Sequence, residues 1–123
     1  MLRTIKTTDF QMTKDVSEYL DSKLNTLDKY IPRDDESIKC DVEIGRSTGH
    51  HQTGNVFKVE INIAIGKKVL RAETEQETIF AAIDAAKDEI AARLRKDKDR
   101  NLRLFKKGSE AIKNFLRFGR RGR

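Results

Sequence analysis

The sequence has few of the residues that form covalent cross-links or metal sites. Its 123 residues include one cysteine, one proline, two histidines and no tryptophan. A single cysteine excludes an internal disulfide. His50 and His51 are adjacent, a spacing that points neighbouring side chains apart instead of toward one ion. We therefore expect no disulfide framework, no bound metal and no other cofactor.

Long apolar runs are absent as well. No stretch approaches the roughly 20 residues that cross a bilayer, and the N-terminal MLRTIKTTDF has charges where a signal peptide has an apolar core. These features predict a cytoplasmic protein with no membrane partner. With 37% hydrophobic residues the chain can bury one modest core, which argues against a multidomain enzyme.

The sequence also lacks motifs for catalysis. The glycines form no phosphate-binding loop of the Walker or dinucleotide type, and the acidic residues show no pair in an apolar setting. Cys40 lies among the apolar positions of a predicted strand, where a free thiol acts as a small hydrophobe. We expect a protein without enzymatic activity and without a small-molecule substrate.

Basic charge is present in excess and is unevenly distributed. Lys and Arg number 26 against 20 Asp and Glu, a formal net charge of +6. Residues 1–92 carry 13 basic and 17 acidic side chains, whereas residues 93–123 carry 13 basic and 3 acidic ones. This density favours an anionic partner such as nucleic acid. A merely solvated helix end is one alternative, and a tail docked on an anionic membrane or an acidic partner is another.

Hydrophobic periodicity predicts the first two elements of secondary structure. Residues 2–7 predict a short strand. Thr13 is a suitable N-cap for an amphipathic helix whose pattern continues until Pro32. The apolar stripe of this helix consists of Val16, Leu20, Leu24, Leu27 and Ile31.

A period of two then predicts strands over residues 38–44 and 57–65, separated by a polar loop over residues 45–54. Gly66-Lys67 fits a two-residue hairpin turn, which places Ile65 opposite Lys68 and continues the pairing into a fourth strand. The expected inward-facing residues are Ile38, Cys40, Val42, Ile44, Phe57, Val59, Ile61, Ile63, Ile65, Leu70 and Ala72.

A second helix follows the fourth strand. Residues 74–77, with the sequence TEQE, have the form of a capping box, and Thr78 is an alternative cap. The helix is expected to continue past Arg95 into the basic segment. Its apolar stripe consists of Ile79, Ile83, Ala86, Ile90 and Leu94.

The order β-α-β-β-β-α predicts an α+β fold, a four-stranded sheet with two helices on one face. The other face carries charges of both signs and no aromatic residue, unlike the base-reading sheet of an RNA-recognition motif. We therefore expect RNA to meet the helices or their ends. The residues of this solvated face are Lys39, Asp41, Glu43, Lys58, Glu60, Asn62, Arg71 and Glu73.

Residues 101–123 form a basic segment that contains aromatic residues. Ser109 is a suitable cap for a short helix, and residues 119–123 are expected to be disordered when nothing is bound. Aromatic rings among cations suit stacking on unpaired bases. Packing on the core or insertion into a membrane interface is the alternative. The candidate RNA-binding residues here are Phe105, Lys106, Lys107, Phe115, Arg117, Phe118, Arg120, Arg121 and Arg123.

Two motifs of the second helix, IFAAID at residues 79–84 and RLRKDK at residues 93–98, resemble the ribosome hibernation-promoting factors, also called ribosome-associated inhibitor or protein Y. The resemblance covers residues 2–100 and includes Met12-Thr13 and Lys23-Leu24 in the first helix. It implies a domain over residues 1–100 that is similar to a double-stranded-RNA-binding domain. It also implies binding in the mRNA and tRNA channel of the small ribosomal subunit, where occupancy blocks translation and keeps ribosomes inactive.

The resemblance further implies rRNA and ribosomal proteins as partners, and we expect a monomer off the ribosome. Asp84 is expected to orient its helix instead of binding RNA. Residues 101–123 depart from the family, whose short form ends in an acidic tail and whose long form adds a dimerisation domain. A general double-stranded-RNA-binding or RNA-chaperone module is the alternative. The rRNA-binding candidates are Lys23, Lys87, Arg93, Arg95, Lys96, Lys98, Arg100 and Arg103.

Overall fold

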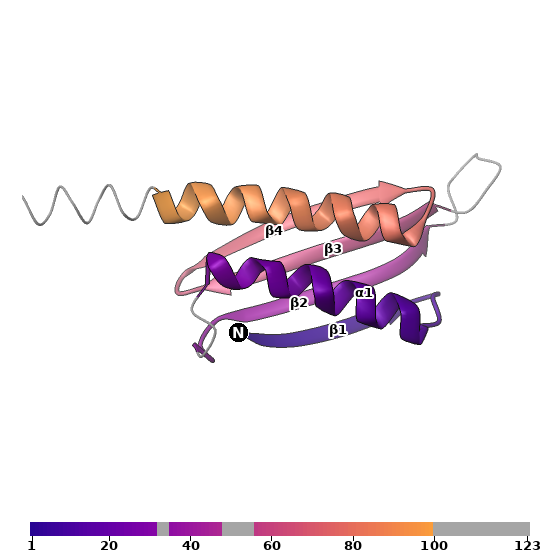
Figure 1. Ribbon diagram of the computed structural model, residues 1–123, viewed down its shortest axis with the longest axis horizontal. Helices are drawn as coiled ribbons and strands as arrows, with labels where there is room; N and C mark the ends of the chain where they lie inside the picture. The colour runs from indigo at the N-terminus through magenta and orange to yellow at the C-terminus, as the bar shows by residue number, and fades with distance from the viewer. Residues whose placement is uncertain (32–34, 48–55, 100–123) are drawn as a thin grey trace, which may run out of the picture.

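One four-stranded sheet carries two helices on the same face (Figure 1). The computed structural model describes residues 1–31, 35–47 and 56–99. The helices are α1 (Lys14–Asn25) and a second helix described over residues 79–99. The strands are β1 (Leu2–Thr8), β2 (Lys39–Ser47), β3 (Val56–Ile65) and β4 (Lys68–Gln76), in the sheet order β1-β2-β3-β4. The predicted α+β fold is thereby confirmed.

The pairing of the strands follows the alternation of apolar and polar residues. β1 and β2 are parallel, whereas β2, β3 and β4 form an antiparallel meander. The predicted hairpin register is confirmed, because Ile65 lies opposite Lys68 and Ile61 opposite Ala72. Gly66 adopts a φ of 60°, which suits a two-residue turn and which glycine tolerates because it has no Cβ.

Helix α1 begins where the sequence predicts and ends earlier. The Thr13 hydroxyl accepts a hydrogen bond of 3.3 Å from the Val16 amide, so Thr13 is the N-cap. The α-helix does not reach Pro32, because a 3₁₀ turn over Thr26–Lys29 follows Asn25. The Thr26 hydroxyl donates to the Lys23 carbonyl at 2.6 Å, a local bond that competes with helix continuation. Leu27 is nevertheless fully buried, so the apolar stripe extends through the tighter turn.

Two boundaries differ from the predictions. The capping box over residues 74–77 is wrong, because strand pairing continues to Gln76. Thr78 is the cap instead, and its hydroxyl accepts from the Ala81 amide at 3.1 Å. The loop predicted from residue 45 is also wrong at its start, because Gly45 to Ser47 continue β2 against β3. Residues 48–54 of that loop lie outside the described ranges.

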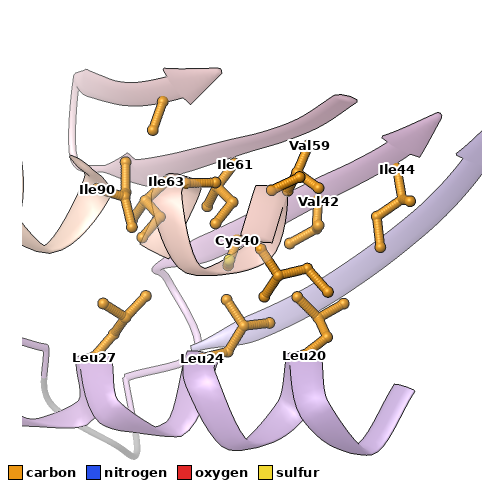
Figure 2. Close-up of a cluster of buried hydrophobic side chains, with 14 of the residues drawn as sticks. Leu20, Leu24, Leu27, Cys40, Val42, Ile44, Val59, Ile61, Ile63 and Ile90 are labelled. Atoms are coloured by element: carbon orange, nitrogen blue, oxygen red, sulfur yellow. The ribbon is translucent and has the colours of Figure 1, made fainter. Parts of the chain in front are cut away.

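Apolar side chains from both layers meet between the helices and the sheet (Figure 2). Leu20 and Leu24 of α1 and Leu27 of the 3₁₀ turn extend toward the sheet, where Cys40 and Val42 face them. Every residue of the two predicted helical stripes is buried. Three of the predicted strand residues, Phe57, Ile65 and Leu70, are only partly buried and pack against the edge of the core.

A buried thiol and an arginine interrupt the apolar side chains on the helix-covered side of the sheet. Burial raises the pKa of the Cys40 thiol to about 11, which keeps the group protonated and weakly nucleophilic at neutral pH. Arg3 lies opposite Cys40 in the register of β1, on the side of the sheet that the helices cover. Its guanidinium donates a hydrogen bond of 2.7 Å to the Asn25 side chain at the end of α1. A polar contact thus holds this edge of the sheet against the helix.

Candidate nucleic-acid interface

On the open face of the sheet, β3 and β4 carry a network of ion pairs. Arg71 contacts the carboxylates of Glu60 at 3.1 Å and Glu73 at 2.7 Å. Lys58 pairs with Glu73 at 3.0 Å, and the hydrogen bonds from Lys58 and Arg71 hold the pKa of the Glu73 carboxyl below its ordinary value. Since each cation already has a carboxylate partner across the strands, this network offers a phosphate little free positive charge.

The basic end of the second helix, defined here as Arg93, Arg95, Lys96 and Lys98, has a different character. All four side chains are exposed, while Leu94 between them is 2% exposed and anchors the helix to the core. Successive residues of an α-helix are rotated by about 100°, so the four cations spread around the helix. This arrangement presents positive charge in several directions from one rigid element.

Within the described residues, these cations differ in their partners. Arg93 pairs with Glu89 one turn earlier, at 3.3 Å. Lys98 donates to the Lys29 carbonyl at 3.3 Å, a contact that leaves its charge uncompensated. Arg95 and Lys96 have no carboxylate within salt-bridge distance in the part of the chain that the structure describes. Of the four cations at the basic end, Arg95 and Lys96 are therefore the most available to a polyanion.

Contacts with neighbouring elements fix the basic end in place. Lys98 connects it to the 3₁₀ turn after α1, and Lys68 at the start of β4 pairs with Asp97 at 2.9 Å. Figure 1 shows that this end of the helix lies beside the β3–β4 turn. Because the supporting groups come from two neighbouring elements, the 3₁₀ turn and β4, the position of this helix end is set before any partner binds.

The other expected site residues lie elsewhere. Lys23 is on α1 and pairs with Asp84 of the second helix at 3.3 Å. Lys87 pairs with Asp88 at 2.7 Å and is largely covered, with 21% of its side chain exposed. Arg100, Arg103 and all the candidates in residues 105–123 lie outside the described ranges, as do His50 and His51.

Sequence reasoning missed an aromatic and polar group between the helices. The Tyr19 hydroxyl donates a hydrogen bond of 2.6 Å to the Asp84 carboxylate. The Tyr19 ring packs edge to face against the Phe80 ring, with the two ring centres 5.0 Å apart. The spacing gives a signal in retrospect. Tyr19 and Lys23 are four apart on α1, and Phe80 and Asp84 are four apart on the second helix, so each pair shares a helix face.

The described residues contain neither a metal-binding cluster nor a membrane-spanning helix. Among residues 1–31, 35–47 and 56–99, no group of three or more His, Cys, Asp or Glu side chains is arranged to hold a metal ion. No helix in these ranges is long and apolar enough to cross a membrane.

Relatives with curated names match most of the chain. A ribosome hibernation promotion factor from Deinococcus radiodurans is 30% identical over 99 residues, which cover 80% of this chain and 49% of the relative. Its counterpart from Picosynechococcus sp. is 29% identical over 97 residues, which cover 79% of this chain and 49% of the relative. The chain thus spans about half the length of these relatives. These matches confirm the resemblance expected from the two helix motifs.

Solved structures and a family profile agree with this result. The N-terminal domain of protein Y from Thermus thermophilus superposes with a TM-score of 0.60 at 21% identity, covering 76% of this chain and 93% of that one. A ribosomal subunit interface protein from Coxiella burnetii superposes with a TM-score of 0.63 at 16% identity, covering 80% of this chain and 99% of that one. The profile of the sigma 54 modulation protein / S30EA ribosomal protein family matches residues 4–102. The chain therefore belongs to the sigma 54 modulation protein / S30EA ribosomal protein family.

Proposed function

We propose that this chain binds the small ribosomal subunit through the basic end of its second helix and keeps ribosomes inactive by occupying the mRNA and tRNA channel. The observation that carries the proposal is the contrast between Arg95 and Lys96, which have no carboxylate partner among the described residues, and the ion-paired Lys58 and Arg71 on the open face of the sheet. Phosphate neutralisation by such cations supplies most sequence-independent RNA affinity. The relatives' names, ribosome hibernation promotion factor and ribosomal subunit interface protein, support a ribosomal partner.

The division of labour within the chain is part of the proposal. Residues 1–99 carry 17 basic and 19 acidic side chains, whereas residues 100–123 carry 9 basic and 1 acidic. The domain over residues 1–100 thus contributes shape and a small set of oriented cations. Arg100 and the tail over residues 101–123, which includes Arg103, contribute most of the net positive charge. No covalent chemistry is involved, because occupancy alone excludes mRNA and tRNA.

Sedimentation through a sucrose gradient tests this function. When the chain is added to a cell lysate, it is expected in the single-ribosome or paired-ribosome peak and to be released by high salt, because its contacts are electrostatic. Purified duplex RNA of similar length is the competitor. A chain that stays at the top of the gradient and binds free duplex RNA with comparable affinity would instead be a general double-stranded-RNA-binding or RNA-chaperone module.

Deleting the tail measures how much it contributes to the affinity for ribosomes. Deleting residues 101–123 removes eight basic side chains and is expected to weaken ribosome binding without abolishing it. If the tail follows single-stranded RNA, the slope of log affinity against log salt falls by roughly 0.7 per phosphate contact removed. Changing Phe105, Phe115 and Phe118 to Ala keeps the charge and is the matched variant. It should cost about 1–3 kcal/mol for each ring that stacks on a base.

An unchanged affinity and an unchanged salt slope after truncation would show that the tail does not contact the ribosome. An anionic membrane or an acidic protein would then become the expected partner of that segment, and liposome flotation would separate those two.

A further inference from the structure

Asp84 occupies an unusual position for a carboxylate, because it lies between the two helices on the side of the fold proposed to face RNA. It accepts the 2.6 Å hydrogen bond from Tyr19 and lies 3.3 Å from the Lys23 ammonium. The Lys23 ammonium is also 5.2 Å from the centre of the Tyr19 ring. Three different interactions therefore converge on one cation and one anion.

The pair is accessible from solvent. The Lys23 side chain is 32% exposed and that of Asp84 is 44% exposed, so an RNA backbone can approach both. The hydrogen bond from Tyr19, together with Lys23, holds the pKa of Asp84 below its ordinary value. Contact with Asp84 raises the pKa of Lys23. Both groups are therefore ionised at neutral pH, and together they form a surface unit with no net charge.

The environment of Lys23 thus contrasts with that of Arg95 and Lys96. A phosphate that approached the Lys23 ammonium would also approach the Asp84 carboxylate, whose repulsion offsets the attraction. A lysine held in this way releases few counterions when RNA binds, because its charge is already balanced within the protein. Lys23, between the helices, is therefore expected to add little to phosphate binding, whereas Arg95 and Lys96 at the basic end are expected to contribute to it.

On the basis of the proposed function, we propose that Asp84 is a specificity-determining residue that neutralises Lys23 and so prevents the surface between the helices from binding phosphates indiscriminately. The RNA backbone is then engaged from the basic end, where contacts of Lys98 and Asp97 hold the helix in position. An RNA duplex with no complementary shape gains little from the rest of the helix face. In this way a carboxylate beside the proposed RNA-binding end would reduce binding to RNA that lacks the complementary shape.

Asp84→Asn is the direct test, since the amide keeps the shape and can still accept from Tyr19 but carries no charge. Lys23 then becomes a free cation. For purified duplex RNA, the slope of log affinity against log salt should steepen by about 0.9, the increment of one phosphate contact on a duplex. A slope steeper by about 0.9 means that, when the salt concentration falls from about 1 M to about 0.1 M, the duplex affinity of the variant rises roughly eightfold more than that of the wild type. Binding to ribosomes should gain much less.

The double variant Lys23→Met with Asp84→Asn is the matched control, because it restores the net charge of the wild type. It should also restore the wild-type slope. Asp84→Glu, which keeps the charge, should leave the slope unchanged. A wild-type slope for Asp84→Asn would overturn the proposal, and so would a double variant whose slope is shallower by about 0.9, because Lys23 would then contact phosphate in the wild type.

A further variant separates this proposal from the proposed function. Arg95→Met with Lys96→Met should make the duplex slope shallower by about 1.8 and weaken ribosome binding. If it changes neither, the assignment of the basic end fails, whatever Asp84→Asn shows. If it behaves as expected while Asp84→Asn matches the wild type, only the role of Asp84 is overturned. Circular dichroism checks that each variant is folded. An unfolded variant would lose affinity for duplex RNA and for ribosomes alike, and its slopes would say nothing about Asp84.

Discussion

Reversing the charge of the basic end is expected to abolish binding to the small ribosomal subunit. The variant replaces Arg93, Arg95, Lys96 and Lys98 by Glu and changes the net charge of the chain by eight units. Each lost phosphate contact removes released counterions, and each new carboxylate adds repulsion. The measurement is the affinity for purified small subunits at a stated salt concentration.

The same variant should stay folded. All four side chains are exposed, and exposed substitutions usually change stability by less than about 0.5 kcal/mol each. A matched pair of variants gives the control at equal charge. Arg95→Glu with Lys96→Glu should lose most binding, whereas Lys6→Glu with Lys39→Glu should keep it. Lys6, opposite Glu43 in the register of β1 and β2, lies with Lys39 on the open face of the sheet. Equal losses from both pairs would show that net charge matters and position does not.

Truncating the core is expected to have the largest effect on stability. Ile61 in β3 and Ile83 in the second helix are both fully buried, one in each layer. Ile61→Ala and Ile83→Ala should each lower the free energy of unfolding by about 2–5 kcal/mol, because each removes buried methyl groups and leaves a cavity. Thermal and urea unfolding measure the change.

Lys58→Ala is the matched control in the same strand as Ile61. Lys58 is on the opposite face, where its side chain is 41% exposed and pairs with Glu73. Exposed ion pairs are worth at most about 1 kcal/mol, so this variant should melt close to the wild type. Equal destabilisation by Lys58→Ala and Ile61→Ala would mean that the faces of the sheet are assigned the wrong way round.

Much of the fold was predictable because hydrophobic alternation determines strand faces. A slip of one residue in β3 would move Ile61 and Ile63 from the core to solvent, so the register is strongly specified. The boundaries were less predictable. The Thr26 side chain makes a local hydrogen bond where α1 gives way to the 3₁₀ turn, and Gly45 stays in β2, where it pairs with β3.

The candidate site was predictable only in part. The density of basic residues after Ala92 is visible in the sequence, and so is the stripe that orients the second helix. The hydrogen-bond and ion-pair partners of these residues cannot be read from the sequence. Tyr19 and Asp84 are 65 residues apart, and only the packing of the helices brings them together. Sequence reasoning therefore treated Lys23 and Lys96 alike, although Lys23 has a carboxylate partner in the folded chain and Lys96 has none among the described residues.

The sheet order also has a consequence for how the chain acquires its shape. β3 and β4 are joined by a two-residue turn, so their pairing closes a very short loop. The parallel pairing of β1 with β2 must close a loop that contains α1, at a greater cost in chain entropy. Folding is therefore expected to begin in the meander. β1, an edge strand in which Leu2 stays 49% exposed, is then the last strand to join the sheet and the first to leave it.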